Sequence, residues 1–180
     1  MTIYFYDFEF NENGKTIEPL SLGIVSNDHR ELYIEYQFDA AKLEHDNPWV
    51  WKNVVPLLRC DPRDRLTVVE AREAILHFLG WKPSWARNPP VPRPEFWGYF
   101  ADYDHVLWCQ HFGKMIDLPP GLPMLTMDLQ QLHIHLGSPA HLRPASSPEQ
   151  HNALEDARWN QRFHANLAAF AKGGEIAIRT

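Results

Sequence analysis

Two acidic residues stand two positions apart near the start of the chain, in the segment Phe5-Tyr6-Asp7-Phe8-Glu9-Phe10. Side chains two apart in a β-strand point to the same face of the sheet, so Asp7 and Glu9 would share one face. Their apolar neighbours predict a central strand, where two carboxylates repel and are driven toward the neutral form unless a cation lies between them. The pair indicates a divalent-cation site, and a solvated acidic edge strand is the alternative.

A third acidic residue, Asp104, lies where a predicted strand is followed by a predicted helix. An acid in the first turn of a helix often only caps the helix or interacts with its dipole, and Asp104 alone fits that role. Asp102 stands closer to the start of the helix. We therefore predict that Asp102 is the cap and that Asp104 belongs to a site.

A histidine and a fourth acid follow in the segment His151-Asn152-Ala153-Leu154-Glu155-Asp156. Residues five apart in one helix differ by about 140° around its axis, which is poor geometry for a shared site. If His151 instead precedes the helix, it can fold back toward Asp156, and Ala153 leaves room for the approach. The alternative is a surface helix with an unrelated histidine and acid. Glu155 points elsewhere and is predicted to be solvated.

The order of these residues is Asp-x-Glu, then a strand-to-helix Asp, then His-x-Ala-x-x-Asp. It resembles the DEDDh branch of the DnaQ-like 3′→5′ exonucleases, which have a ribonuclease H-like fold. The matching positions are Asp7, Glu9, Asp104, His151 and Asp156. The resemblance implies that the four acids bind two divalent cations and that the histidine is the general base. Mg²⁺ and Mn²⁺ prefer carboxylate oxygens, and two such ions can clamp the attacking and leaving oxygens of a phosphodiester.

A narrower resemblance extends over most of the chain and thins between residues 40 and 95. It is carried by the motifs Phe5–Phe10, Thr16-Ile17-Glu18, Tyr103-Asp104-His105-Val106, Cys109-Gln110 and Asp156-Ala157-Arg158. These motifs look like ribonuclease AS, a group of bacterial exoribonucleases selective for polyadenylate. This resemblance implies that the substrate is the 3′ end of single-stranded RNA, with adenylate-rich ends preferred, and that the protein is a homodimer. The alternatives are a DNA exonuclease with the same mechanism and a catalytically inactive module that binds nucleic acid.

Aromatic residues flank the acids, and bases stack on aromatic rings. Phe8, Phe10 and Tyr103 are therefore predicted to contact the base or sugar of a substrate, although each is equally suited to a core. Arg158 lies two residues beyond Asp156 and is predicted either to reach a phosphate or to be solvated.

Two other groups of residues are weaker candidates for a site. His133-x-His135 has the composition of a zinc site, but no cysteine or acid accompanies it at ligand spacing, so we interpret it as part of a helix surface. Trp81 and Trp85 could form a shelf for a ligand, or they could be buried under the proline-rich loop 81–94.

The pattern along the chain predicts one domain, residues 1–180, with an α/β fold in which helices flank a mixed central β-sheet. Strands are predicted at 3–10, 20–26 and 31–36 as an antiparallel meander, and at 95–101. Helices are predicted at 48–58, 67–79, 103–112, 127–136 and 152–171, the last ended by Gly173-Gly174.

Charge and composition limit the kinds of protein that fit. The net charge of −6 argues against a protein that coats nucleic acid with basic side chains. It does not exclude a nuclease, because bound cations can supply the positive charge. The two cysteines lack metal-site or redox spacing, and the sequence has neither a leader pattern nor an apolar run of about 18 residues. We therefore expect a cytoplasmic protein.

Overall fold

A computed structural model describes residues 1–173; Gly174, part of the predicted end of the last helix, lies outside this range. The described residues form one five-stranded sheet with the strand order β3-β2-β1-β4-β5. The strands are β1 (Ile3–Glu12), β2 (Ile17–Ser26), β3 (Glu31–Glu35), β4 (Glu95–Gly98) and β5 (Met127–Asp128). The first three strands pair antiparallel, as predicted, while β4 is parallel to β1 and β5 is parallel to β4. The strand that carries the acidic pair is therefore central.

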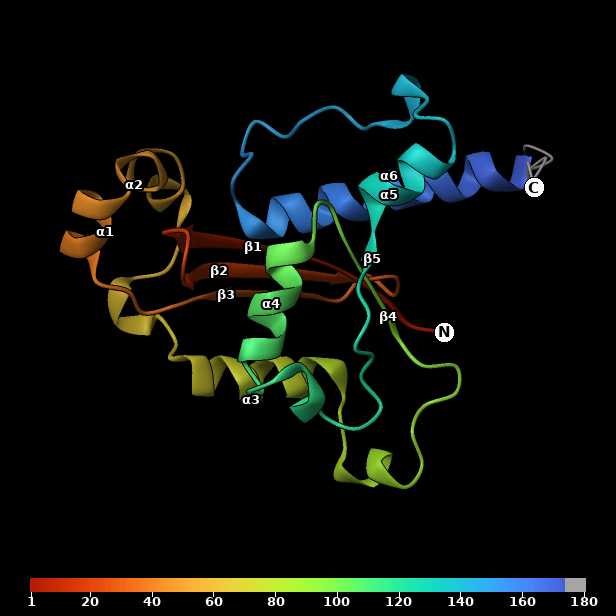
Figure 1. The fold of residues 1–180 in the computed structure, drawn as a ribbon, viewed down its shortest axis with the longest axis horizontal. Coiled ribbons are helices and arrows are strands. Elements are labelled where there is room, and N and C mark those ends of the chain that lie inside the picture. Colours follow the sequence, from red (N-terminus) through yellow and green to blue (C-terminus); the bar gives the residue numbers. More distant parts are fainter. Residues whose placement is uncertain (174–180) are drawn as a thin grey trace.

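Helices lie on both sides of this sheet. They are α1 (Ala40–Asp46), α2 (Pro48–Asn53), α3 (Val68–Leu79), α4 (Asp102–Gln110), α5 (Leu129–His135) and α6 (Ala153–Gly173). Figure 1 shows α5 and α6 along one side of the sheet, α3 along the other, and α1 and α2 gathered at one end. This is the predicted α/β arrangement, a mixed open sheet flanked by helices, and it is consistent with a ribonuclease H-like fold. None of the helices in residues 1–173 is both long and apolar enough to span a membrane.

The alternation of β1 divides its residues between the two layers. Tyr4, Tyr6 and Phe8 are buried in the largest core cluster, on the side covered by α3 and α4. Phe5 faces the other way and packs with Phe163 and other residues of α5 and α6. Residues 7 and 9 therefore point toward the side of the sheet that α6 covers.

The start of α6 lies almost in contact with the backbone of β2. Gly23 of β2 pairs with Asp7, and a Cβ added to Gly23 would lie only 2.3 Å from the carbonyl oxygen of Ala153. Asn152 holds this end of the helix, because its Oδ1 accepts the N–H of Glu155 at 3.3 Å and its Nδ2 donates to the carbonyl of Leu57 at 3.1 Å. The absence of a side chain at position 23 thus sets how closely α6 approaches the acidic strand.

Several predicted boundaries need correction. The helix predicted at 48–58 ends at Asn53 and is followed by a 3₁₀ turn, Val55–Leu57, because Pro56 cannot donate a helical hydrogen bond. The strand predicted to reach residue 101 ends at Gly98. Residues 127–128, predicted to begin a helix, form the short strand β5 instead. Helix α1 was not predicted.

The predicted cap of α4 is also wrong. Ala101, not Asp102, occupies the N-cap position, and no side chain of α4 caps the helix. The carboxylate of Asp128 accepts the N–H of Ala101 at 2.9 Å instead. Since Asp128 ends β5, the start of α4 is tied to the neighbouring strand rather than capped by its own sequence.

The weaker candidates of the sequence prove to be structural. His133 is buried rather than on a helix surface, and its Nε2 donates to the carbonyl of Pro139 at 3.1 Å. Trp81 packs against the main core and donates its indole N–H to the carbonyl of Pro120 at 3.1 Å. Trp85 also packs against this core and would contact any side chain placed at Gly121. The two tryptophans hold the loop 81–94 against the body of the protein.

We expect Gly23→Ala to destabilise the protein by roughly 1–3 kcal/mol, because the added methyl group forces α6 away from β2. Urea denaturation measures this change in the free energy of unfolding. Lys15→Ala, in the exposed turn of the same hairpin, is the control and should change it by less than about 0.5 kcal/mol. Equal stability of Gly23→Ala and the wild type would show that the close approach of α6 is not required.

Candidate active site

Three of the four predicted carboxylates meet where the middle of β1 faces the start of α6. Carboxylate oxygens of Asp7, Glu9 and Asp156 all lie within 4.8 Å of one another, and each of the three residues is partly buried. Asp7 and Glu9 come from one face of a strand, and Asp156 comes from the helix that covers that face. A single cation could contact all three, so this donor set fits a hard divalent ion.

His151 lies just before α6 and turns back toward the acids, as the sequence predicts. Its backbone is in the left-handed region, with φ of 75°, and its N–H donates to Oδ2 of Asp156 at 2.8 Å. A non-glycine residue in this region is strained and persists only where its surroundings enforce it. The hydrogen bond to Asp156 uses the backbone of His151 and leaves the imidazole available for chemistry.

Asp104 approaches the site from helix α4. Its carboxylate is buried, and Oδ1 accepts the backbone N–H of Phe8 at 2.7 Å. Strand β4 pairs with residues 3–5 of β1 and ends at Gly98, so it does not reach Phe8. The amide of Asn160 in α6 donates to the carbonyl of Tyr6 at 3.0 Å. Side chains of α4 and α6 thus satisfy the backbone of β1 beyond the end of β4, and one of them is the fourth carboxylate.

Burial raises the pKa values of all four carboxyl groups, and repulsion by other members of the cluster raises those of Asp7 and Glu9 further. Burial, and then the charges of Asp104, Glu9 and Asp156, raise the pKa of Asp7 well above its ordinary value. Burial and the charges of Asp156 and Asp104 raise the pKa of Glu9 to about 8. Burial raises the pKa of Asp104 to about 7, against its hydrogen bond from Phe8, and burial also raises that of Asp156. The ionised cluster is therefore costly unless cations neutralise it.

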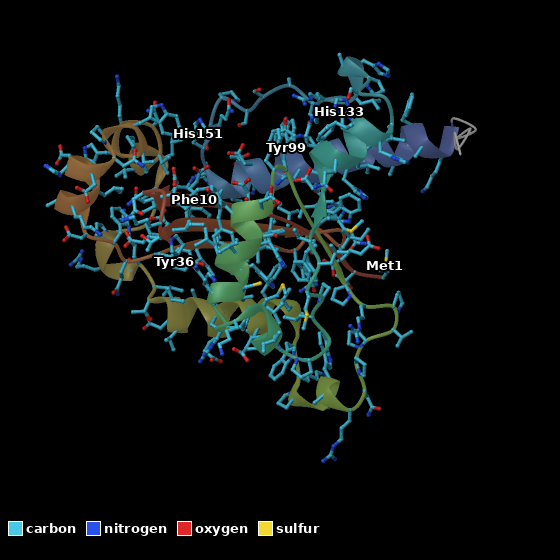
Figure 2. The ribbon with its side chains drawn as sticks, in the orientation of Figure 1. Met1, Phe10, Tyr36, Tyr99, His133 and His151 are labelled. Atoms are coloured by element: carbon cyan, nitrogen blue, oxygen red, sulfur yellow. The ribbon has the colours of Figure 1, made fainter. Side chains whose placement is uncertain are left out.

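All five predicted catalytic residues line one cavity of about 440 Å³. Its other described lining residues are Phe8, Phe10, Tyr99, Phe100, Arg143, Ser146, Ser147, Gln150, Trp159 and Asn160. Figure 2 labels three residues of this lining, His151, Phe10 and Tyr99, near the first half of α6. The volume is within the range of about 300–1,000 Å³ that is typical of small-molecule sites.

The predicted substrate contacts fare differently in the structure. Phe8 has a buried ring, 3% exposed, that belongs to the core. Phe10 lines the cavity, whereas Tyr103 is not among the lining residues and packs edge-on against Phe10, with ring centroids 5.7 Å apart. Arg158 also lies outside the lining.

Arg158 forms ion pairs with two carboxylates outside the acidic cluster. Its guanidinium is 2.5 Å from Glu31 of β3 and 2.5 Å from Glu155 on its own helix. Glu155 is correspondingly paired rather than solvated, which corrects the sequence-based expectation. These pairs join α6 to the sheet and leave Arg158 poorly placed to bind a phosphate.

Three of the lining residues that the sequence analysis did not identify are Tyr99, Phe100 and Arg143. Phe100 is 63% exposed although it is large and apolar, and its φ of 53° is unusual for a non-glycine residue. The guanidinium of Arg143 lies 5.6 Å from the ring centroid of Tyr99 and donates to Oε1 of Gln130 at 2.6 Å. Among the described lining residues, Arg143 is the one arginine or lysine. The Tyr-Phe pair just before the helix of Asp104 was the available signal.

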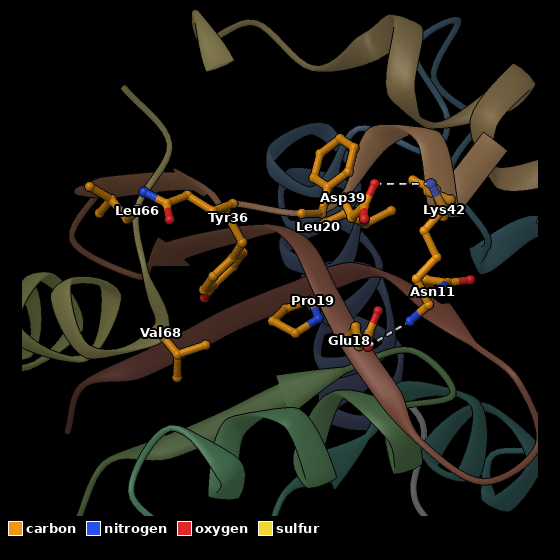
Figure 3. A pocket seen from close by; sticks show the side chains of 12 residues that line it. Asn11, Glu18, Pro19, Leu20, Tyr36, Asp39, Lys42, Leu66 and Val68 are labelled. Atoms are coloured by element: carbon orange, nitrogen blue, oxygen red, sulfur yellow. Dashed lines mark hydrogen bonds and ion pairs between the residues drawn. The ribbon is translucent and has the colours of Figure 1, made fainter. Parts of the chain in front are cut away.

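A separate cavity of about 330 Å³ lies between β2, residues 36–39 and α1, and contains none of the five predicted catalytic residues. Figure 3 shows Lys42 reaching across it toward Glu18, at 3.6 Å. Asp39 caps α1 by accepting the N–H of Lys42 at 3.0 Å. The charged groups Glu18, Asp39 and Lys42 of this cavity therefore already have partners.

Two curated proteins are similar to this chain over almost its whole length. Both are named 3′-5′ exoribonuclease, Rv2179c from the H37Rv strain and MT2234.1 from the CDC 1551 strain of Mycobacterium tuberculosis. Each is 37% identical over 177 residues, an alignment that covers 98% of this chain and 99% of the relative. No protein-family model matches the chain.

We expect Asp7→Asn to raise the free energy of unfolding when divalent cations are chelated. Because the folded-state pKa values of the cluster lie above the ordinary values of 3.8 and 4.5, folding takes up protons, and stability falls as pH rises from about 4 to about 8. Asp7→Asn removes one of the repelling charges. The gain should therefore be largest near pH 8 and disappear below about pH 4.

Added Mg²⁺ or Mn²⁺ should reverse this order by stabilising the wild type more than Asp7→Asn. Thermal unfolding with EDTA and with each cation measures both effects, and Glu44→Gln, at an exposed position of α1, is the control. Equal stabilisation of wild type and Asp7→Asn by the cations would mean that Asp7 does not bind them.

Proposed function

The chain belongs to the 3′-5′ exoribonuclease family, and we propose that it hydrolyses single-stranded RNA by the DEDDh mechanism with two divalent cations. As a member of this family it is a 3′-5′ exonuclease. The observation that carries the proposed mechanism is the convergence of Asp7, Glu9, Asp104, His151 and Asp156 on one cavity, with three of the carboxylates within 4.8 Å of one another.

Asp7, Glu9, Asp104 and Asp156 are the groups that would hold the cations. When bound, the cations offset the charge of the cluster and stabilise the negative charge that develops on the phosphate during hydrolysis. The raised pKa values of the four acids support this role, because a cluster that is costly to ionise alone gains most from a positive charge.

His151 is proposed to be the general base. Its imidazole accepts a proton from a water molecule as the water oxygen attacks the terminal phosphodiester. The bond from phosphorus to the 3′ oxygen of the shortened strand breaks, and a nucleoside 5′-monophosphate is released. The hydrogen bond from the backbone of His151 to Asp156 fixes where the imidazole stands.

The side of the cavity formed by Tyr99, Phe100 and Arg143 is suited to the terminal nucleotide. Exposed aromatic rings stack on bases, and a guanidinium pairs with phosphate. Phe10 remains a proposed contact, whereas the ring of Phe8 is assigned to the core and Arg158 to its ion pairs. We propose that these contacts favour purines, since a purine has the larger stacking face.

The narrower assignment to ribonuclease AS remains a proposal that rests on the sequence motifs. It implies a preference for adenylate-rich ends, with Glu9 or a neighbouring backbone group recognising the ribose 2′-OH that distinguishes RNA from DNA. It also implies a homodimer. Both cysteines are free thiols, which supports the proposed cytoplasmic location.

His151→Ala should lower kcat by roughly 10²–10⁴-fold with little change in KM, because the general base acts in the chemical step rather than in binding. Steady-state kinetics on an RNA oligomer with Mg²⁺ measures both constants. Added imidazole should restore part of kcat in this variant. His141→Ala, at an exposed position outside the lining of the catalytic cavity, serves as the control. A variant that keeps kcat but loses affinity would make His151 a substrate contact.

The substrate preference is tested with oligo(A), oligo(U), oligo(C) and oligo(dA) of equal length, and a mixed RNA that ends in guanine. We expect the fastest initial rate on oligo(A), a slower rate on oligo(dA), and no hydrolysis with EDTA. Equal rates on all substrates would remove the adenylate preference and leave the exonuclease. Faster hydrolysis of oligo(dA) than of oligo(A) would indicate a DNA exonuclease.

A further inference from the structure

Trp49 in α2 is an exposed tryptophan beside the catalytic cavity. Trp49 is 56% exposed. Its ring centroid lies 5.2 Å from that of His151, and the two rings are nearly perpendicular, at 84°. A large aromatic side chain half in water forgoes much of the burial that usually stabilises it. Its position next to the proposed general base suggests that a ligand covers it.

Another cavity, of about 410 Å³, lies against this ring, and we call it the Trp49 cavity. It is lined by Glu9, Phe10, Glu12, Asn47, Trp49, Val50, Val54 and His151. Three of these residues, Glu9, Phe10 and His151, also line the catalytic cavity. The two cavities are thus neighbouring parts of one surface, with a carboxylate of the cluster and the proposed base between them.

The chemistry of the Trp49 cavity suits a nucleobase rather than a phosphate. None of its eight described lining residues is a lysine or an arginine, and Glu9 and Glu12 are acids. The side chain of Asn47 already accepts the N–H of Val50 at 3.3 Å and donates to Asn11 at 3.0 Å. What remains is an aromatic and aliphatic wall, which can stack against a planar, uncharged group such as a nucleobase.

Helix α2 holds Trp49 in a fixed place. Asn47 caps the helix and Pro48 occupies its first turn. Val50 and Val54 are buried in a small core with Leu20 and Leu43 of the neighbouring elements, so the adjacent Trp49 is turned outward. A ring presented by an anchored helix loses little conformational freedom when a base stacks on it.

The catalytic cavity and the Trp49 cavity indicate the direction in which the RNA strand runs. The catalytic cavity is bordered by β1, residues 99–104, the segment 143–151 and α6, so it is suited to enclose the one nucleotide that is released. The rest of the RNA would then pass Glu9 and His151, which line both cavities, and reach Trp49. We propose that Trp49 stacks on the base immediately 5′ of the scissile phosphodiester, an inference that rests on the proposed exoribonuclease activity.

The test combines protein variants with RNA from which single bases are removed. The substrates are an adenylate hexamer and three hexamers in which 1-deoxyribose, which has no base, replaces the last, second-last or third-last nucleoside. First-turnover kcat/KM is measured with Mg²⁺ for the wild type, Trp49→Ala and Trp49→Phe. Binding of the same oligomers is measured by fluorescence anisotropy with Ca²⁺ in place of Mg²⁺. Phe170→Ala removes an exposed ring outside both cavities and is the control.

The wild type should lose roughly fivefold to a hundredfold in kcat/KM when the second-last base is removed, mainly through KM. Trp49→Ala should lose a similar factor on the intact hexamer and lose little more on the hexamer without that base. Trp49→Phe should keep most of the effect. Two results would overturn the proposal. One is an equal loss of kcat/KM in the wild type and in Trp49→Ala when the second-last base is removed. The other is that Trp49→Ala abolishes the effect of removing the last base rather than that of removing the second-last base.

The binding measurement separates this proposal from the proposed function. If no hexamer is hydrolysed, the exonuclease mechanism fails, while the dependence of binding on Trp49 and on the second-last base still decides the stacking proposal. Two results would overturn it regardless of activity. One is that the wild type binds the intact hexamer and the hexamer without the second-last base equally well. The other is that Trp49→Ala binds the intact hexamer as well as the wild type does.

Discussion

Four carboxyl groups gathered in one partly buried cavity repel one another, and the rest of the molecule is arranged to hold them there. Burial and neighbouring charges raise the pKa of every member, so the protein alone is not at its most stable with all four ionised. Bound divalent cations would remove this cost, and the proposed hydrolysis of a phosphodiester requires the same stabilisation of negative charge. The free protein is thus less stable than it would be without the acidic cluster, which lies where the middle of β1 faces the start of α6.

Two backbone features bring the acids together. The first is Gly23, whose missing side chain lets the start of α6 approach β2 beside Asp7 and so places Asp156. The second is the short length of β4, which ends before it can pair with the far half of β1. Asp104 and Asn160 take over the backbone groups that another strand would have satisfied, so a requirement of folding also positions one of the four carboxylates.

The sequence predicted which residues come together at the candidate site, and it predicted their surroundings poorly, for physical reasons. Strand periodicity alone places Asp7 and Glu9 on one face, and the reversal of His151 toward Asp156 follows from helix geometry. Contacts between distant segments leave no such pattern. Arg158 of α6 forms an ion pair with Glu31 of β3, which is distant in the sequence. The exposure of Trp49 depends on which neighbours of α2 are anchored in the core, and the left-handed backbone of Phe100 has no signature in residue type.

Anomalous diffraction from crystals soaked in Mn²⁺ with a nucleoside 5′-monophosphate tests whether these carboxylates hold two divalent cations. We expect two manganese peaks roughly 3.5–4 Å apart, each in contact with oxygens from among those of Asp7, Glu9, Asp104 and Asp156. Manganese bound elsewhere, or a cluster that remains free of manganese at saturating concentration, would contradict it.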